Sequence, residues 1–180
     1  MKIAIDIGHA RGTGAQGLVS ERSVVETAAG LLQSELEKLG IQSELIDFPW
    51  LSNGGDLERT IAAVNAGGYE LSISLHTDCS DNTAARGAHV CYYSLKGYTL
   101  AIEIADRLCP MMPGRAAKVV RRMDLGVLKR TKPVAVLIEL GFVSNEHDAD
   151  KLANPSALRK LVAEIADGIR FYIERVVQGG

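Results

Sequence analysis

Residues 3–7 read Ile3-Ala4-Ile5-Asp6-Ile7, an apolar run typical of a short buried β-strand. A helical pattern follows over residues 21–39, where apolar side chains recur at helical spacing until Gly40 ends the helix. Residues 41–46 then predict a second strand. This order of strand, helix and strand indicates an α/β fold.

The rest of the chain continues the same alternation. Its predicted elements are a helix over 57–64 capped by Asp56, strands over 71–75 and 87–93, a helix over 99–108, a strand over 134–138 and a helix over 158–173. Residues 109–124 hold two prolines and a glycine, and we expect a loop with a short strand there. No repeat or linker divides the sequence. We therefore expect one α/β domain over residues 1–180, with a central, mostly parallel, twisted sheet flanked by helices.

The composition is that of an ordinary globular protein. Of the 180 residues, 47% are apolar and 23% are charged, which excludes disorder as the main state. The three cysteines, an odd number without a CxxC pair, exclude a disulfide scaffold. A net charge of −2 gives no electrostatic reason to expect nucleic acid or an anionic membrane as a partner.

The N-terminus does not resemble a signal peptide. Its apolar run is too short, Asp6 interrupts it, and no cleavage site of small residues follows. Elsewhere no stretch reaches the roughly 18 uninterrupted apolar residues of a membrane span. We expect synthesis in the cytoplasm, with no signal peptide and no transmembrane segment.

Four polar residues lie where predicted strands end or helices begin. His9 follows the first strand, His76 and Glu139 directly follow the strands over 71–75 and 134–138, and Glu21 opens the first helix. Ligands of open α/β sheets bind outside the carboxyl ends of the strands. If the strands are parallel, these four side chains face one crevice.

Two imidazoles and one carboxylate can form a three-ligand zinc site with an open fourth position, as in catalytic zinc sites. A second carboxylate nearby would serve as a general base for an attacking water molecule. The ligands lie far apart in the sequence and no HExxH motif occurs. The pattern alone therefore leaves open that these are ordinary polar residues at loop edges.

A dinucleotide site is the main competing interpretation. The segment Gly12-Thr-Gly14-Ala-Gln-Gly17 matches GxGxxG between a strand and a helix, and Asp47 ends the second strand, where a ribose-binding acid would lie. The spacing disagrees with this fingerprint. Gly12 comes several residues after the strand, and Asp47 lies 30 positions after Gly17 where about 20 are expected. The alternative is a loop whose glycines let the backbone approach a ligand.

Five ordered segments resemble the zinc-dependent N-acetylmuramoyl-L-alanine amidases of the Amidase_3 type. They are Ile3-Ala-Ile-Asp-Ile-Gly-His9, Ser20-Glu21, Ser74-Leu-His76-Thr-Asp78, Gly87-Ala-His-Val-Cys-Tyr-Tyr-Ser94 and Val136-Leu-Ile-Glu139-Leu-Gly-Phe-Val-Ser-Asn145. The resemblance spans nearly the whole chain. It implies a zinc-peptidase-like or amidase-like α/β fold and a catalytic domain that covers residues 1–180.

The same resemblance implies roles for the four polar residues. His9, Glu21 and His76 would be zinc ligands, and Glu139 would be the catalytic acid/base. The bond cleaved would be the amide between N-acetylmuramic acid and L-alanine in peptidoglycan, so the enzyme would act on the cell wall after export or release. Asp78, two residues after His76, is a candidate acceptor for an imidazole N–H, and the alternative is a surface loop carboxylate without that role.

Other functions remain open from the sequence. A zinc peptidase that cuts stem peptides would use the same metal chemistry, with Arg115, Arg121 or Arg122 available for a terminal carboxylate. A non-catalytic wall-binding protein would lack the catalytic acid, whereas Glu139 is present. Both an endolysin and an autolysin that remodels the cell's own wall fit the sequence.

Overall fold

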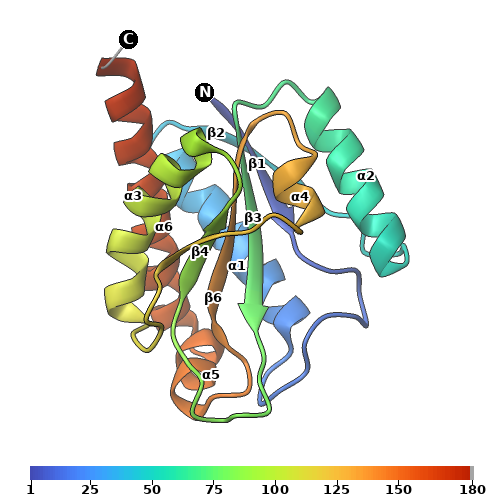
Figure 1. Cartoon of the computed structure of the whole chain (residues 1–180), viewed down its shortest axis with the longest axis vertical. Helices are drawn as coiled ribbons and strands as arrows, with labels where there is room; N and C mark the ends of the chain where they lie inside the picture. The colour runs from blue at the N-terminus through green and yellow to red at the C-terminus, as the bar shows by residue number, and fades with distance from the viewer. Residues whose placement is uncertain (179–180) are drawn as a thin grey trace.

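A six-stranded β-sheet forms the centre of the computed structural model of the chain, which describes residues 1–178 (Figure 1). The strands are β1 (Lys2–Ile7), β2 (Gln42–Ile46), β3 (Leu71–Asp78), β4 (His89–Tyr92), β5 (Val119–Arg121) and β6 (Val134–Phe142). They lie in the order β2-β1-β3-β6-β4-β5. Strands β2, β1, β3 and β6 are parallel, and β4 runs antiparallel to β6. The predicted mostly parallel α/β sheet is confirmed.

Helices cover both faces of the sheet. They are α1 (Glu21–Lys38), α2 (Asn53–Ala66), α3 (Leu95–Met111), α4 (Gly126–Lys129), α5 (Glu146–Ala153) and α6 (Pro155–Gln178). In Figure 1, α1, α3 and α6 lie on one side of the sheet and α2 and α4 on the other. Within residues 1–178, every helix is too short or too polar to cross a lipid bilayer.

The strand β6 shows how its sequence separates the two faces. Val136 and Ile138 pack into the main core beneath α1, α3 and α6. Ala135 and Leu137 alternate with them and pack into a smaller cluster with α4. Because side chains alternate along a strand, Glu139 continues the second series and points to the face that carries α2 and α4.

Two strands are longer than their apolar runs predict. The ladder between β3 and β6 continues past Leu75 and Ile138 and pairs His76 with Glu139. The sequence places both polar residues just after their strands, whereas the structure places them inside β3 and β6. Backbone hydrogen bonding continues there although the side chains become polar, because the ladder does not depend on side-chain hydrophobicity.

Two helix predictions also need correction. The predicted cap Asp56 lies inside α2, and Ser52 caps this helix, its hydroxyl accepting a hydrogen bond from the amide of Gly55. The helix α3 continues through Pro110 into the segment predicted as a loop. The short strand expected within 109–124 is β5, while the four-residue helix α4 was not predicted.

Candidate metal centre

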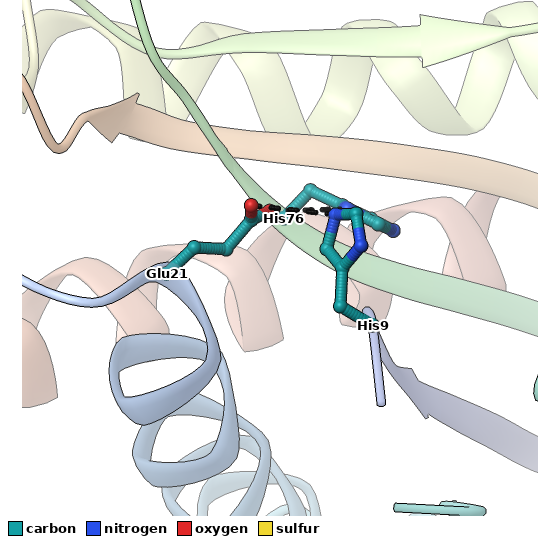
Figure 2. Close-up of side chains that lie close together, drawn as sticks. All are labelled: His9, Glu21 and His76. Carbon is teal, nitrogen blue, oxygen red and sulfur yellow. Dashed lines mark hydrogen bonds and ion pairs between the residues drawn. The ribbon is translucent and has the colours of Figure 1, made fainter. Parts of the chain in front are cut away.

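Three side chains from separate segments converge beside the carboxyl ends of β1 and β3 (Figure 2). His9 follows β1, Glu21 is the first residue of α1, and His76 lies in β3. The distance from Nδ1 of His76 to Oε1 of Glu21 is 3.2 Å, and that from Nε2 of His9 to Oε2 of Glu21 is 3.3 Å. The candidate ligand atoms of all three residues lie within 4.8 Å of one another.

These separations fit a zinc ion. With zinc–ligand bonds of 2.0–2.1 Å and tetrahedral geometry, two ligand atoms of one ion lie about 3.3 Å apart. Two imidazole nitrogens and a carboxylate are also a donor set of catalytic zinc sites with an open position. Among the described residues, no second group of His, Cys, Asp or Glu has such a geometry.

The carboxylate of Glu21 is held ionised in a buried place. Burial opposes its ionisation, but hydrogen bonds from His76, His9 and the backbone amides of Ala15 and Thr77 outweigh that effect and keep its pKa well below the usual range. Its position in the first turn of α1 also favours a negative charge. The side chain is therefore ready to bind a cation without first losing a proton.

Two glycines allow the backbone to approach these ligands. A Cβ atom on Gly8 would lie 2.5 Å from the ring of His76, so only glycine fits beside that imidazole. Gly14 has φ of +84°, and a Cβ there would lie 3.1 Å from both Glu21 and His9. The GxGxxG segment therefore packs against the candidate ligands, and the Ala15 amide within it donates to Glu21.

The predicted catalytic residue Glu139 lies on the same face of the sheet as His76. The two residues are paired across β6 and β3 and thus point to the same side. Oε2 of Glu139 is buried and has no hydrogen-bond partner within residues 1–178. Burial, which the positive influence of His76 only partly offsets, raises the pKa of Glu139 to about 7. A carboxylate with such a pKa can both accept and return a proton near neutral pH.

The carboxylate of Asp78 faces His89 and not the imidazole of His76. Its Oδ2 lies 3.5 Å from Nδ1 of His89 and 4.0 Å from the guanidinium of Arg115. His89 is buried and paired with Glu139 across β4 and β6. Burial and the nearby arginines lower the pKa of His89 to about 4, so this imidazole is neutral. The hydrogen-bond acceptor at Nδ1 of His76 is Glu21.

The family described as "N-acetylmuramoyl-L-alanine amidase" matches residues 3–170. The chain belongs to this amidase family. Apart from Lys2, the first residue of β1, the match covers all strands of the sheet, and it includes all three candidate ligands together with Glu139. The resemblance seen in the sequence is thereby confirmed.

Individual amidase relatives agree with this family. The chain is 33% identical over 103 residues to the "Probable cell wall amidase LytH" of Staphylococcus epidermidis, covering 56% of this chain and 34% of that protein. It is 28% identical over 123 residues to the "Germination-specific N-acetylmuramoyl-L-alanine amidase" of Bacillus subtilis, covering 67% and 52%. The chain thus spans at most about half the length of these two curated relatives.

Solved structures show the same amidase fold. The catalytic domain of the CD27L endolysin, described as targeting Clostridia Difficile, has 33% identity and a TM-score of 0.85, over 95% of this chain and 97% of that one. The catalytic domain of the amidase CwlV from Bacillus (Paenibacillus) polymyxa has 23% identity and a TM-score of 0.85, over 96% and 98%. The second likeness is one of fold alone.

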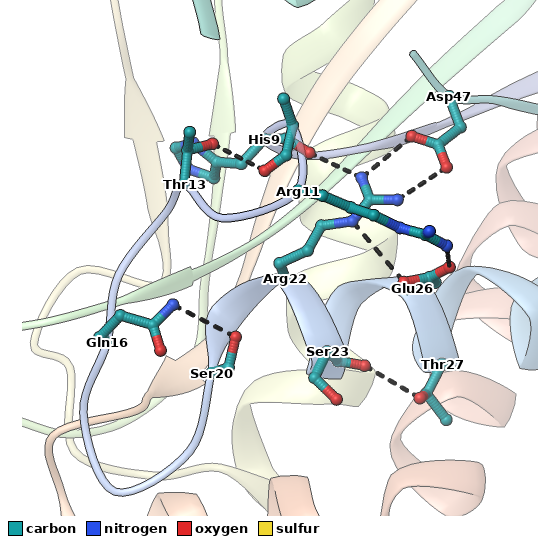
Figure 3. Close-up of polar contacts among 11 residues, drawn as sticks. His9, Arg11, Thr13, Gln16, Ser20, Arg22, Ser23, Glu26, Thr27 and Asp47 are labelled. Atoms are coloured by element: carbon teal, nitrogen blue, oxygen red, sulfur yellow. Dashed lines mark hydrogen bonds and ion pairs between the residues drawn. The ribbon is translucent and has the colours of Figure 1, made fainter. Parts of the chain in front are cut away.

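An arginine to which the sequence patterns assign no role fixes the backbone of His9. His9 has φ of +65°, a left-handed conformation that is strained for a residue with a side chain. The buried guanidinium of Arg22 donates to the His9 carbonyl at 2.6 Å and to the two carboxylate oxygens of Asp47 at 3.0 and 2.7 Å. Figure 3 shows Arg22 between these two partners. Asp47, which the dinucleotide interpretation assigned to a ribose, thus forms an ion pair. One feature of the sequence does indicate a role for Arg22. It is a charged residue on the apolar stripe of α1, three positions before Val25.

Replacing Arg22 with lysine should weaken zinc binding roughly tenfold, at the lower end of the effects of residues that orient metal ligands. A lysine ammonium keeps the charge but cannot bridge a carboxylate and a carbonyl as the planar guanidinium does. Competition with a chromophoric chelator measures the affinity. Arg130→Lys is the matched control, because Arg130 forms a bidentate but exposed pair with Glu58. Unchanged zinc affinity in Arg22→Lys would contradict the positioning role.

The buried carboxyl group of Asp56 should make the free energy of unfolding depend on pH. Burial, with the charges of Asp6 and Asp47, raises the pKa of Asp56 from 3.8 to about 6. The folded protein therefore holds this proton more tightly than the unfolded chain, and its stability falls as pH rises through that window. We expect Asp56→Asn to be more stable than the native chain at pH 7 by roughly 1–3 kcal/mol, at about 1.4 kcal/mol per pKa unit, with the difference vanishing near pH 4. Urea unfolding with EDTA present measures this, and a pH-independent difference would disprove it.

Proposed function

We propose that the chain is a zinc-dependent hydrolase that cleaves the amide bond between N-acetylmuramic acid and L-alanine in peptidoglycan. His9, Glu21 and His76 would hold the zinc ion, and Glu139 would be the acid/base. The observation that carries this proposal is the convergence of three zinc-type ligand atoms beside a buried, unpartnered carboxylate oxygen in an amidase fold.

The chemistry divides between the ion and the chain. When bound, zinc supplies a Lewis acid that polarises a carbonyl group and lowers the pKa of water. Glu139 accepts the proton of the water molecule that attacks the lactyl carbonyl carbon. As the carbon–nitrogen bond breaks, Glu139 returns this proton to the departing nitrogen of alanine, so that a carboxylic acid and a free amine result.

The remaining residues keep the site in place. Arg22 holds the backbone of His9, and the Ala15 and Thr77 amides hold Glu21. Glu139 is held by pairing of β6 with two neighbouring strands, through His76 on one side and His89 on the other. Such fixed supports keep metal ligands and an acid/base in their productive geometry.

The substrate and the place of action are part of the same proposal. We infer that peptidoglycan is the partner, that residues 1–180 act as an amidase catalytic domain, and that the enzyme meets the cell wall after export or release. The names of the relatives, a cell wall amidase and an endolysin, support this inference.

Analysis of the ends released from purified peptidoglycan tests the proposal. An amidase produces stem peptides with free L-alanine amino groups and leaves the glycan strands intact. Cleavage only within the stem peptide would show the zinc peptidase instead. Absence of both products from zinc-loaded protein would refute the proposed activity.

A further inference from the structure

A cavity of about 270 Å³ opens beside His9 and His76, between the sheet and the helices α2 and α4. Its apolar wall includes Leu57, Val127 and Leu137. It therefore adjoins the candidate metal centre on the same face as Glu139, where part of a bound substrate would lie. No step of the mechanism proposed above uses it.

Two buried acids line this cavity in addition to the imidazoles. Asp6 is 5% exposed and Asp56 is 6% exposed. Asp6 accepts hydrogen bonds from the hydroxyls of Ser74 and Thr60, at 2.5 and 3.4 Å. These donors are neutral, so they satisfy oxygen atoms of Asp6 without balancing its charge.

Asp56 has even less compensation. Its Oδ1 is buried and has no hydrogen-bond partner among the described residues. Arg22, whose charge favours ionisation of Asp56, is already engaged by Asp47 and by the carbonyl of His9. Within residues 1–178, no lysine or arginine forms an ion pair with Asp6 or Asp56. The imidazoles of His76 and His9 and the guanidinium of Arg22 offset the burial of these two acids only in part, since the pKa of Asp6 and that of Asp56 are both raised. A buried carboxylate without an ion-paired cation is costly, which indicates that a positive group from outside belongs here.

The residues that line the cavity favour one kind of cation over another. Asp6 and Asp56 do not belong to any group of three or more metal-type ligands in the described part of the chain, which argues against a second metal ion. A primary ammonium has three N–H donors and takes oxygen acceptors such as these. The apolar side chains of Leu57, Val127 and Leu137 suit the methylene groups that carry such an ammonium.

We propose that this cavity binds the side-chain alkylammonium of a diamino acid in the stem peptide. This inference rests on the proposed function and specifies its substrate class. Acylation of the amine, as in a cross-link, removes the charge that the two carboxylates would bind. The enzyme would therefore prefer stem peptides that carry a free amine to stem peptides joined through that amine.

Two soluble muramyl tripeptides that differ only in the third residue, lysine or norleucine, test this preference with zinc-loaded enzyme. We expect KM to be about tenfold lower for the lysine peptide, the effect of a charge-assisted hydrogen bond, and kcat to be similar for both. In Asp56→Asn, KM for the lysine peptide should rise to that of the norleucine peptide, which should not change. Asp106→Asn is the matched control, because Asp106 is exposed on α3, across the sheet.

The outcomes separate this inference from the proposed function. Equal KM values in the native enzyme, or an equal rise for both peptides in Asp56→Asn, would overturn the ammonium site while leaving the amidase activity in place. If neither peptide is cleaved, the proposed activity fails. In that case, calorimetry measures the affinities of the two intact peptides for the zinc-loaded protein. Tighter binding of the lysine peptide would support the ammonium site, and equal binding would contradict it.

Discussion

Replacement of Glu139 with glutamine is expected to lower the rate of amide hydrolysis by a factor of roughly 10²–10⁴, the usual contribution of a general acid/base. Glutamine has nearly the same shape but cannot take up the proton of the attacking water. Because Glu139 is not among the three converging ligands, zinc content should not change. Release of L-alanine amino groups and elemental analysis of the same sample measure the two effects.

The matched control for this variant is Glu37→Gln, because Glu37 is an exposed glutamate on α1. It should leave both turnover and zinc content unchanged. A Glu139→Gln protein that retains full activity would remove Glu139 from the mechanism. A protein that loses zinc together with activity would instead make Glu139 a fourth ligand.

The second large effect is expected from His76→Ala. Residues that only orient a metal ligand contribute about 10–100-fold to affinity, so loss of a ligand itself should cost more than 100-fold. Zinc occupancy after dialysis should fall close to zero, and wall lysis should fall with it. His9→Ala should behave in the same way, since its ring nitrogen lies as close to Glu21.

His147→Ala provides the control, because His147 is exposed on α5 and lies outside the converging group. Circular dichroism separates loss of metal from loss of fold. A chelator should likewise abolish the activity of the native enzyme, and added zinc should restore it. A His76→Ala protein that is free of metal and fully lytic would refute the zinc mechanism.

The sequence predicts the sheet well because its central strands are buried on both faces. Residues 134–138 of β6, for example, form a continuous apolar run, and the order of such strands with the helices indicates a parallel sheet. The ends of β3 and β6 could not be predicted in this way, since His76 and Glu139 break the apolar pattern while the backbone ladder continues. The start of α2 was missed because Asp56 resembles a cap, whereas it lies buried inside the helix.

The convergence of His9, Glu21 and His76 could be predicted because each lies beside the same edge of a parallel sheet. The contacts that hold these three residues in place could not be predicted. The contact of Arg22 with the His9 carbonyl depends on a left-handed backbone conformation, and its contact with Asp47 joins segments 25 residues apart. Nothing in the local sequence indicates that Oδ1 of Asp56 would be enclosed without a partner, because that depends on how α2 packs against the sheet.

The placement of His76 and Glu139 inside central strands, and not in loops, bears on how proteins with this fold can diversify or be redesigned. Surface loops tolerate insertions and exchanges far better than the strands they connect. Connecting segments, such as residues 79–88 between β3 and β4, can therefore be exchanged to change what the proposed enzyme recognises. During such exchanges His76 and Glu139 would remain paired across β3 and β6.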